Sequence, residues 1–390
     1  MPVNRLPIGS YVRIEKTELQ EVVDSLKELG FFTVGPRVVD EAIIYGELEK
    51  VEQLPIGLVD EQDGGKYRLH PSKTNSWFDY TVGPESLKKY LFPPNETLFQ
   101  SHQIDGDWQF EESAFSSRSL AVIGPRACDL HALAIQDRVF LKGYYVDPNY
   151  QRRRHDLFIV AVNCRRAAPV CFCHSMGTGP AVRDNFDLAL IEMSDHFVVE
   201  IGTERGGTVI STAEWSPCTL DQVEAAKAVT AILESSMQDR DAQTDSVLCP
   251  ESPRERCLET ADVHDLLLNN LDHSRWEHVA ERCLSCANCT MVCPTCFCCS
   301  VEDISDLSGE NVRRERTWDS CFTAEHSYTN TGVVRKLTAS RYRQWLTHKL
   351  ATWQDQFGVS GCVGCGRCIT WCPVGIDLTE EVAAIRGDQQ

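Results

Sequence analysis

The sequence predicts an α/β (α+β) N-terminal domain that contains a parallel βαβ unit, followed by a helix-rich domain built around cysteine motifs. Three observations predict this architecture. The chain has 390 residues, which is more than one ordinary hydrophobic core needs. Residues 119–163 alternate between strand-like and helix-like patterns, and the cysteines are concentrated toward the C-terminus. The polar stretch 238–256 is the best linker, and it predicts domains at 1–245 and 257–390.

The βαβ unit is the clearest element of the N-terminal domain. Residues 119–124 form a short apolar run, residues 128–141 have a helical pattern, and residues 155–163 form a second apolar run. Strand, helix and strand in this order predict two parallel strands joined by a right-handed crossover. The carboxyl ends of both strands then lie at the same edge of the sheet.

Apolar and amphipathic patterns predict the remaining elements of this domain. An amphipathic pattern predicts a helix at 17–29. None of the predicted segments carries a recognisable catalytic constellation. The predicted strands are 31–39, 42–49, 186–193, 196–203 and 207–211, and a further helix is predicted at 219–237.

Charge and hydropathy exclude several classes of protein. The 38 basic and 57 acidic side chains give a net charge of −19, which disfavours binding to nucleic acid or to an anionic membrane surface. No apolar run approaches the roughly 18–20 residues that a membrane span needs. The first residues lack the apolar core of a signal peptide. We therefore expect a cytoplasmic protein with no nucleic-acid partner and no membrane partner.

Cysteines carry the strongest functional signal. The chain has 19 of them, with none in the first 127 residues and seven in residues 283–299. In a reducing cytoplasm, clustered thiols bind metal or take part in redox chemistry rather than form a disulfide scaffold. The spacing of the cysteines therefore decides the interpretation.

Two runs share the spacing C-x2-C-x2-C-x3-C followed by proline. This spacing is typical of bacterial [4Fe–4S] proteins, because a short loop wraps three thiolates around one cube. In two-cluster proteins the fourth cysteine of each run ligates the other cluster. The first run comprises Cys283, Cys286, Cys289 and Cys293, and the second comprises Cys362, Cys365, Cys368 and Cys372.

We therefore predict two [4Fe–4S] clusters with exchanged fourth ligands. Zinc and disulfides are the alternatives, but zinc usually takes separated pairs of ligands, whereas each run supplies a third close cysteine. A spacer of 68 residues with a long helical pattern separates the runs, so we expect a helical di-[4Fe–4S] ferredoxin-like domain. The predicted ligands are Cys283, Cys286, Cys289 and Cys372 for cluster 1, and Cys362, Cys365, Cys368 and Cys293 for cluster 2.

A weaker pattern indicates a third site in the N-terminal domain. Cys128 follows the first parallel strand and Cys164 follows the second, so both lie at the carboxyl edge of the sheet. Cys171 and Cys173 come shortly afterwards. Three interpretations remain open for these four thiols: a third [4Fe–4S] cluster, a zinc site, or buried structural cysteines. The other clustered cysteines, which either pack around the clusters or ligate in another arrangement, are Cys296, Cys298, Cys299 and Cys321.

Ordered motifs along the chain resemble those of one protein family. The segments are GPRACDLHALAIQDRVF, DPNYQRRR, CFCHSMGTGP, CPTCFCCSVED, RERTWDSCF and CVGCGRCITWCPVGID. Over residues 30–386 the chain resembles the iron–sulfur β subunit of cytoplasmic NAD(P)-linked [NiFe] hydrogenases, the sulfhydrogenases. The electron-input subunit of anaerobic sulfite reductase is similar. Cys299 is an extra cysteine that departs from the family pattern.

The resemblance implies an electron-transfer subunit of an oxidoreductase complex with no catalytic site of its own. It implies a relay between a flavin/NAD(P)-binding subunit and the small and large subunits of a [NiFe] hydrogenase. The chain carries no nickel-binding terminal motif and no flavin or nicotinamide fingerprint, as this division of labour requires. The alternatives are the electron-input subunit of an anaerobic sulfite reductase and a stand-alone iron–sulfur redox protein. Within the spacer, Arg341 and Arg343 are expected to raise a cluster potential by stabilising the reduced state.

Overall fold

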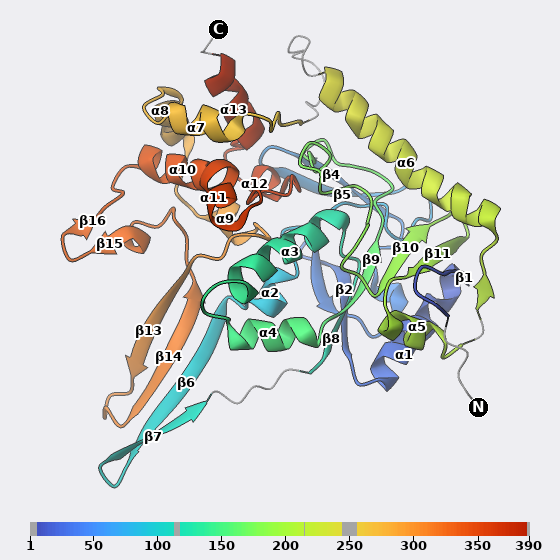
Figure 1. Ribbon diagram of the computed structural model, residues 1–390, viewed down its shortest axis with the longest axis horizontal. Helices are drawn as coiled ribbons and strands as arrows, with labels where there is room; N and C mark the ends of the chain where they lie inside the picture. Colours follow the sequence, from blue (N-terminus) through green and yellow to red (C-terminus); the bar gives the residue numbers. More distant parts are fainter. Residues whose placement is uncertain (1–5, 113–117, 214, 244–255, 388–390) are drawn as a thin grey trace.

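The computed structural model describes residues 6–112, 118–213, 215–243 and 256–387. They form a large mixed sheet with helices on both faces, a helical region around the C-terminal cysteine runs, and a second sheet that projects from the body (Figure 1). The predicted α/β character is confirmed. Of the predicted linker 238–256, residues 238–243 are instead part of a helix, and residues 244–255 lie outside the described residues. No helix in the described ranges is long and apolar enough to cross a membrane.

The large sheet has eight strands in the order β12-β1-β11-β10-β9-β8-β2-β3. Its centre is parallel, and antiparallel strands complete both edges. The predicted βαβ unit is confirmed, since Ala121 pairs with Phe158 in parallel register. The strands are β1 (Tyr11–Glu15), β2 (Phe32–Val39), β3 (Ala42–Glu47), β8 (Leu120–Ile123), β9 (Phe158–Val162), β10 (Leu188–Glu192), β11 (His196–Ile201) and β12 (Ser216–Pro217).

Helices cover both faces of this sheet, which explains why strands β8 and β9 are apolar at every position. Because successive side chains point to opposite faces, Val160 packs in the core beneath the first pair of helices and Ile159 in the core beneath the second group. One face carries α1 (Leu19–Glu28) and α5 (Glu204–Ile210), and the other carries α2 (Lys88–Leu91), α3 (Ala127–Leu141) and α4 (Pro148–His155).

The predicted strand at 207–211 is wrong, because residues 207–210 belong to helix α5 and Ser211 caps its C-terminus. The side chain of Thr203 accepts a hydrogen bond from the backbone N–H of Gly206 and thereby caps the helix. Val209 and Ile210 are buried on one side of α5, so tertiary packing outweighs their preference for strands.

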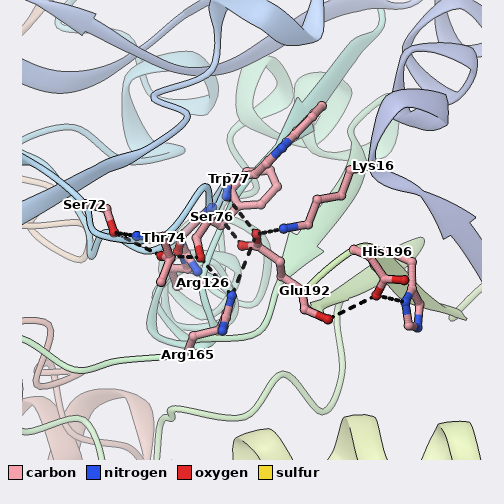
Figure 2. A network of polar contacts seen from close by, with 12 residues as sticks. Lys16, Ser72, Thr74, Ser76, Trp77, Arg126, Arg165, Glu192 and His196 are labelled. Carbon is pink, nitrogen blue, oxygen red and sulfur yellow. Dashed lines mark hydrogen bonds and ion pairs between the residues drawn. The ribbon is translucent and has the colours of Figure 1, made fainter.

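A buried glutamate ties a loop to the sheet. Glu192 closes β10 and is 1% exposed, and its carboxylate accepts hydrogen bonds from the backbone N–H groups of Trp77 (2.7 Å) and Phe78 (2.9 Å). Lys16 neutralises the carboxylate at 2.6 Å (Figure 2). A buried charge needs such partners, so this network fixes the loop around residue 78 beside the carboxyl edge of the sheet.

The C-terminal helices gather at one end of the molecule (Figure 1). A π-helical turn at His348–Thr352 joins α10 to α11, and α9 packs against α12. The helices are α7 (Val263–Asn269), α8 (Arg275–Arg282), α9 (Asn288–Met291), α10 (Thr338–Thr347), α11 (Trp353–Phe357), α12 (Arg367–Thr370) and α13 (Leu378–Gly387), while α6 (Leu220–Gln243) flanks the large sheet.

The projecting sheet joins distant parts of the chain, with strand order β13-β14-β6-β7 (Figure 1). Its β13–β14 hairpin lies between the two cysteine runs, where the sequence predicts mostly helical connections. Strands β14 and β6 pair along almost their whole length, so both predicted domains contribute to one sheet. The bounds are β6 (Asn95–Ile104), β7 (Asp107–Glu112), β13 (Cys299–Ser305) and β14 (Asn311–Trp318), and two small hairpins are β4 (Leu58–Asp63) with β5 (Lys66–Pro71) and β15 (Tyr328–Thr329) with β16 (Gly332–Val333).

Candidate functional site

A pocket in the helical region brings together thiols from both cysteine runs. Three of these thiols come from the first run, around the start of α9, and one follows α12. Together they are the four predicted ligands of cluster 1. We refer to them as the first thiol group. Backbone N–H groups point at two of their sulfur atoms, from Ser285 (3.4 Å) and Ile376 (3.3 Å). Five cysteines line the pocket: the four of the first thiol group, which are Cys283, Cys286, Cys289 and Cys372, and also Cys368.

Unused hydrogen-bond donors border the same pocket. The hydroxyl of Tyr342 and the indole N–H of Trp345 are buried and find no partner among the described residues, although both side chains line the pocket. Buried donors without partners are costly, and sulfur atoms of an iron–sulfur cluster accept such hydrogen bonds. The donor set of the pocket therefore fits a [4Fe–4S] cluster.

The second thiol group combines the second run with Cys293 of the first. Burial raises the pKa of the Cys362, Cys365 and Cys368 thiols, and charge at Cys293 raises each pKa further. The four predicted ligands of cluster 2 therefore share one neighbourhood. The backbone N–H of Gly364 donates to the Cys362 sulfur at 3.4 Å.

A buried lysine supplies positive charge to the second thiol group. Lys349 lies in the π-helical turn, is 3% exposed, and places its Nζ 3.2 Å from the Cys293 sulfur and 3.5 Å from the Cys296 sulfur. Although burial disfavours its charge, the neighbouring sulfur atoms raise the pKa of Lys349 well above its usual value. The arginines expected in this role point elsewhere, Arg341 to Thr338 and Arg343 to the carbonyl of Leu271.

The structure also brings together the third thiol group, Cys128, Cys164, Cys171 and Cys173. Burial is the largest influence that raises the pKa of these four thiols. Charge at Cys164 also raises the pKa of Cys171 and Cys173, and charge at Cys173 raises that of Cys128. The four thiols are therefore neighbours at the carboxyl edge of the sheet.

Arg126 is the cation of the third thiol group. Its guanidinium donates to the carbonyls of Phe78 (3.1 Å) and Tyr80 (3.0 Å), in the loop that Glu192 anchors, and it hydrogen-bonds the Cys164 side chain. Figure 2 shows Arg126 beside this loop. The anchored loop thus holds a positive charge against the thiols.

The second and third thiol groups are in backbone contact. The N–H of Phe172 donates to the carbonyl of Gly364 at 2.8 Å. A Cβ at Gly364 would lie 2.5 Å from the carbonyl oxygen of Phe172, and a Cβ at Gly366 would lie 2.5 Å from that of Val170. Only glycine allows this close approach, and both glycines also have a positive φ. The loop of the second run therefore lies directly on the loop of the third group.

A buried ion pair reinforces this contact. Arg367, 1% exposed, is paired at 2.7 Å with Asp129, the residue after Cys128. Its guanidinium also donates to the carbonyl of Gly83 at 2.8 Å. Sequence reasoning missed Arg126 and Arg367, and it did not single out Lys349 from the other basic residues of the spacer, because a charged residue inside a helix pattern or a cysteine motif gives no sign of being buried.

Without a bound metal, burial keeps most of these thiols protonated, whereas only the deprotonated thiolate binds metal. Among the residues that the structure describes, no three His, Cys, Asp or Glu side chains converge to hold a single metal ion. A cubane cluster spreads its ligands over four irons instead, so it fits thiols that surround a space. Cluster binding would deprotonate the thiols and link metal content to folding.

Comparisons with known proteins agree with this interpretation. Residues 282–376 match a family described as a 4Fe-4S dicluster domain. Over 382 residues, covering 96% of this chain and 98% of the relative, the chain is 28% identical to sulfhydrogenase 2 subunit beta of Pyrococcus furiosus. No solved structure gives a significant match. The resemblance inferred from the motifs is thus confirmed: the chain contains a 4Fe-4S dicluster domain and is similar over nearly its whole length to a sulfhydrogenase β subunit.

Proposed function

We propose that this protein is a non-catalytic electron-transfer subunit that holds three [4Fe–4S] clusters, one at each thiol group. Each cluster, when bound, exchanges single electrons at a potential set by charge, hydrogen bonds and exposure. The observation that carries the proposal is the continuous succession of thiol groups. Charge at Cys365 raises, after burial, the pKa of Cys128, Cys171 and Cys173, and Cys368 lines the pocket of the first group.

The three thiol groups differ in exposure, and this difference indicates which end of the series lies at the surface. The third group is enclosed between the sheet and the second group. The first group reaches the surface, because Cys286 is exposed and Leu284 beside it is 63% exposed. We therefore assign the docking surface for a redox partner to the first thiol group, since electron exchange needs close approach.

The partners follow from the resemblance to the sulfhydrogenase subunit. In this proposal the chain relays electrons between a flavin/NAD(P)-binding subunit and the small and large subunits of a [NiFe] hydrogenase in the cytoplasm. Isolation of the native complex tests the assignment, because a co-purifying nickel protein supports it. A siroheme protein would replace it with the sulfite reductase alternative, and a chain that purifies alone would support a stand-alone redox protein.

Iron analysis of the protein, isolated without air, tests the number of clusters. Three clusters require about 12 iron atoms per chain, whereas about 8 would leave the third thiol group empty of iron. Cys171→Ser should remove about four iron atoms and one electron paramagnetic resonance signal. Cys218→Ser is the matched control, because Cys218 is a half-buried thiol outside the three groups. Equal iron contents of the two variants would refute the third cluster.

The exchange of fourth ligands has its own test. Cys286→Ser and Cys372→Ser alter the first thiol group, so both should perturb the same cluster signal in the reduced protein. Cys293→Ser should instead perturb the signal that Cys365→Ser perturbs. A Cys293 variant that changes the same signal as Cys286→Ser would show uncrossed ligation.

A further inference from the structure

A fourth cluster of reactive side chains lies outside the three thiol groups, at the base of the β13–β14 hairpin. Cys299 pairs with Trp318 at the end of the ladder, so the residues just beyond it are neighbours. The backbone N–H of Asp319 donates to the carbonyl of Cys298 at 2.9 Å. The cluster comprises Cys298, Asp319, Cys321 and His326.

A tight turn after β14 brings a second thiol back to Cys298. The hydroxyl of Ser320 accepts from the backbone N–H of Phe322 at 3.1 Å, and the backbone N–H of Thr323 donates to the Ser320 carbonyl at 2.9 Å. Both the thiol and the backbone N–H of Cys321 then hydrogen-bond the Cys298 sulfur.

An imidazole and a carboxylate complete the arrangement. His326 hydrogen-bonds the Cys298 side chain and places its Nδ1 2.9 Å from the Asp319 carboxylate. The carboxylate is itself fixed by the hydroxyls of Ser300 (2.6 Å) and Thr323 (2.8 Å). A thiol, an imidazole and an orienting carboxylate in this order are the parts of an activated cysteine nucleophile.

We propose that Cys298 and Cys321 are a redox-active dithiol that reduces small-molecule disulfides by thiol–disulfide exchange. Cys298 is the nucleophile, Cys321 the resolving thiol, and His326 the group that moves protons. All three side chains are half-buried, so solvent-borne small molecules can reach the pair more readily than a folded protein can. This activity needs no electron from the clusters, so it stands apart from the proposed relay.

The protonation states agree with these roles. The hydrogen bond from Cys321 is the largest influence and lowers the pKa of Cys298 well below its usual value, with His326 acting in the same direction. Hydrogen bonding to Cys298 raises the pKa of His326 to about 9. Cys298 is therefore a thiolate beside an imidazolium at neutral pH. The titratable and charged groups facing the pair are His326, Asp319, Lys88, Lys349, His348 and Cys289.

The exchange balances with the groups present. The Cys298 thiolate attacks one sulfur of R–S–S–R, the disulfide bond breaks, and the leaving thiolate takes the proton of the His326 imidazolium. Cys321 then gives its thiol proton to the neutral imidazole and attacks the Cys298 sulfur. The second R–S⁻ leaves and takes that proton from His326. One disulfide and two protein thiols thus become two R–SH and a Cys298–Cys321 disulfide.

The test uses the complete, cluster-loaded protein without air and glutathione disulfide as the probe. Wild type should release two glutathione molecules per chain and yield a Cys298–Cys321 cross-linked peptide by mass spectrometry. Cys321→Ser should stop after one release, with glutathione attached to Cys298. Cys298→Ser should release none, and His326→Gln should react at least about 10-fold more slowly.

Cys299→Ser is the matched control. Cys299 is adjacent to Cys298, but its thiol packs with Trp318 on the other side of the strand, so this variant should react as wild type does. The proposal is overturned if the Cys298 variant still forms two glutathiones. It is also overturned if Cys321→Ser loses about four iron atoms per chain, because the pair would then hold a cluster. Unchanged iron in all three cysteine variants shows that they are folded.

Discussion

The two cysteine loops have the same spacing and the same backbone shape, yet they differ in composition. In the first loop the residues with positive φ are Ser285 (52°) and Ala287 (66°). The matching positions of the second loop are Gly364 (62°) and Gly366 (76°). A left-handed conformation alone therefore does not require glycine in this motif.

What the second loop adds is contact with other backbone. Its glycines lie against the loop of the third thiol group, whereas the first loop faces the pocket and the surface. Glycine thus occurs in the loop that contacts another thiol group, and larger residues occur in the loop that does not. The buried loop is shaped to touch another site, and the first loop, with Cys286 exposed, borders the pocket and the surface.

The largest expected effect comes from removing the ion pair behind the second loop. Arg367→Met leaves Asp129 as an uncompensated buried carboxylate, which costs about 3–5 kcal/mol. We expect a lower anaerobic unfolding midpoint and loss of iron. The double variant with Asp129→Asn should recover part of this loss, since it removes the unpaired charge. An Arg367→Met protein with wild-type stability would show that the pair does not hold the two sites together.

A methyl group on the second loop tests the close approach directly. Gly364→Ala should cost about 2–4 kcal/mol, because it combines a positive φ with a clash against Phe172. Gly358→Ala is the matched control, since Gly358 also has a positive φ of 70° but its Cβ would meet only Arg138 at 3.6 Å. The difference between the two unfolding midpoints isolates the contact from the backbone strain, and equal losses would contradict the backbone contact.

The third expected effect is a shift in the midpoint potential of one cluster, because a buried lysine lies beside the second thiol group. Lys349 touches Cys293 of the second thiol group, and the described residues place no lysine within hydrogen-bond reach of a first-group sulfur. Lys349→Met should lower one cluster midpoint by about 60 mV, a tenfold change in a one-electron equilibrium. Arg343→Met is the control and should leave all midpoints unchanged, because Arg343 lies beside Asp272. Redox titration followed by electron paramagnetic resonance distinguishes the two results.

Local patterns predicted the elements whose geometry is set within a short stretch of chain. The βαβ unit follows from two apolar runs, and each cysteine loop follows from its own spacing. The β13–β14 hairpin could not be predicted, because β13 is largely exposed and lacks an alternating apolar face. Its partner strand, β6, lies far earlier in the chain, and no local pattern encodes such pairing.

The roles of single charged residues could not be predicted from the sequence, because their burial depends on the tertiary fold. Lys349 and Arg343 both occur in one helical, basic segment, and only the fold buries the first and exposes the second. The proposed redox pair of Cys298 and Cys321 was equally hidden, since the segments that carry the two thiols lie side by side only after β13 and β14 have paired.

The smallest expected effect completes the comparison of the loops. Ala287→Gly introduces into the first loop the residue that the second loop uses at the same position. It relieves a left-handed alanine, worth about 1–2 kcal/mol, but it increases the entropy of the unfolded chain by a comparable amount. We expect a free energy of unfolding within about 1 kcal/mol of wild type and unchanged iron. A large loss would mean that the Ala287 methyl group supports the first thiol group, and that both loops are shaped by contact after all.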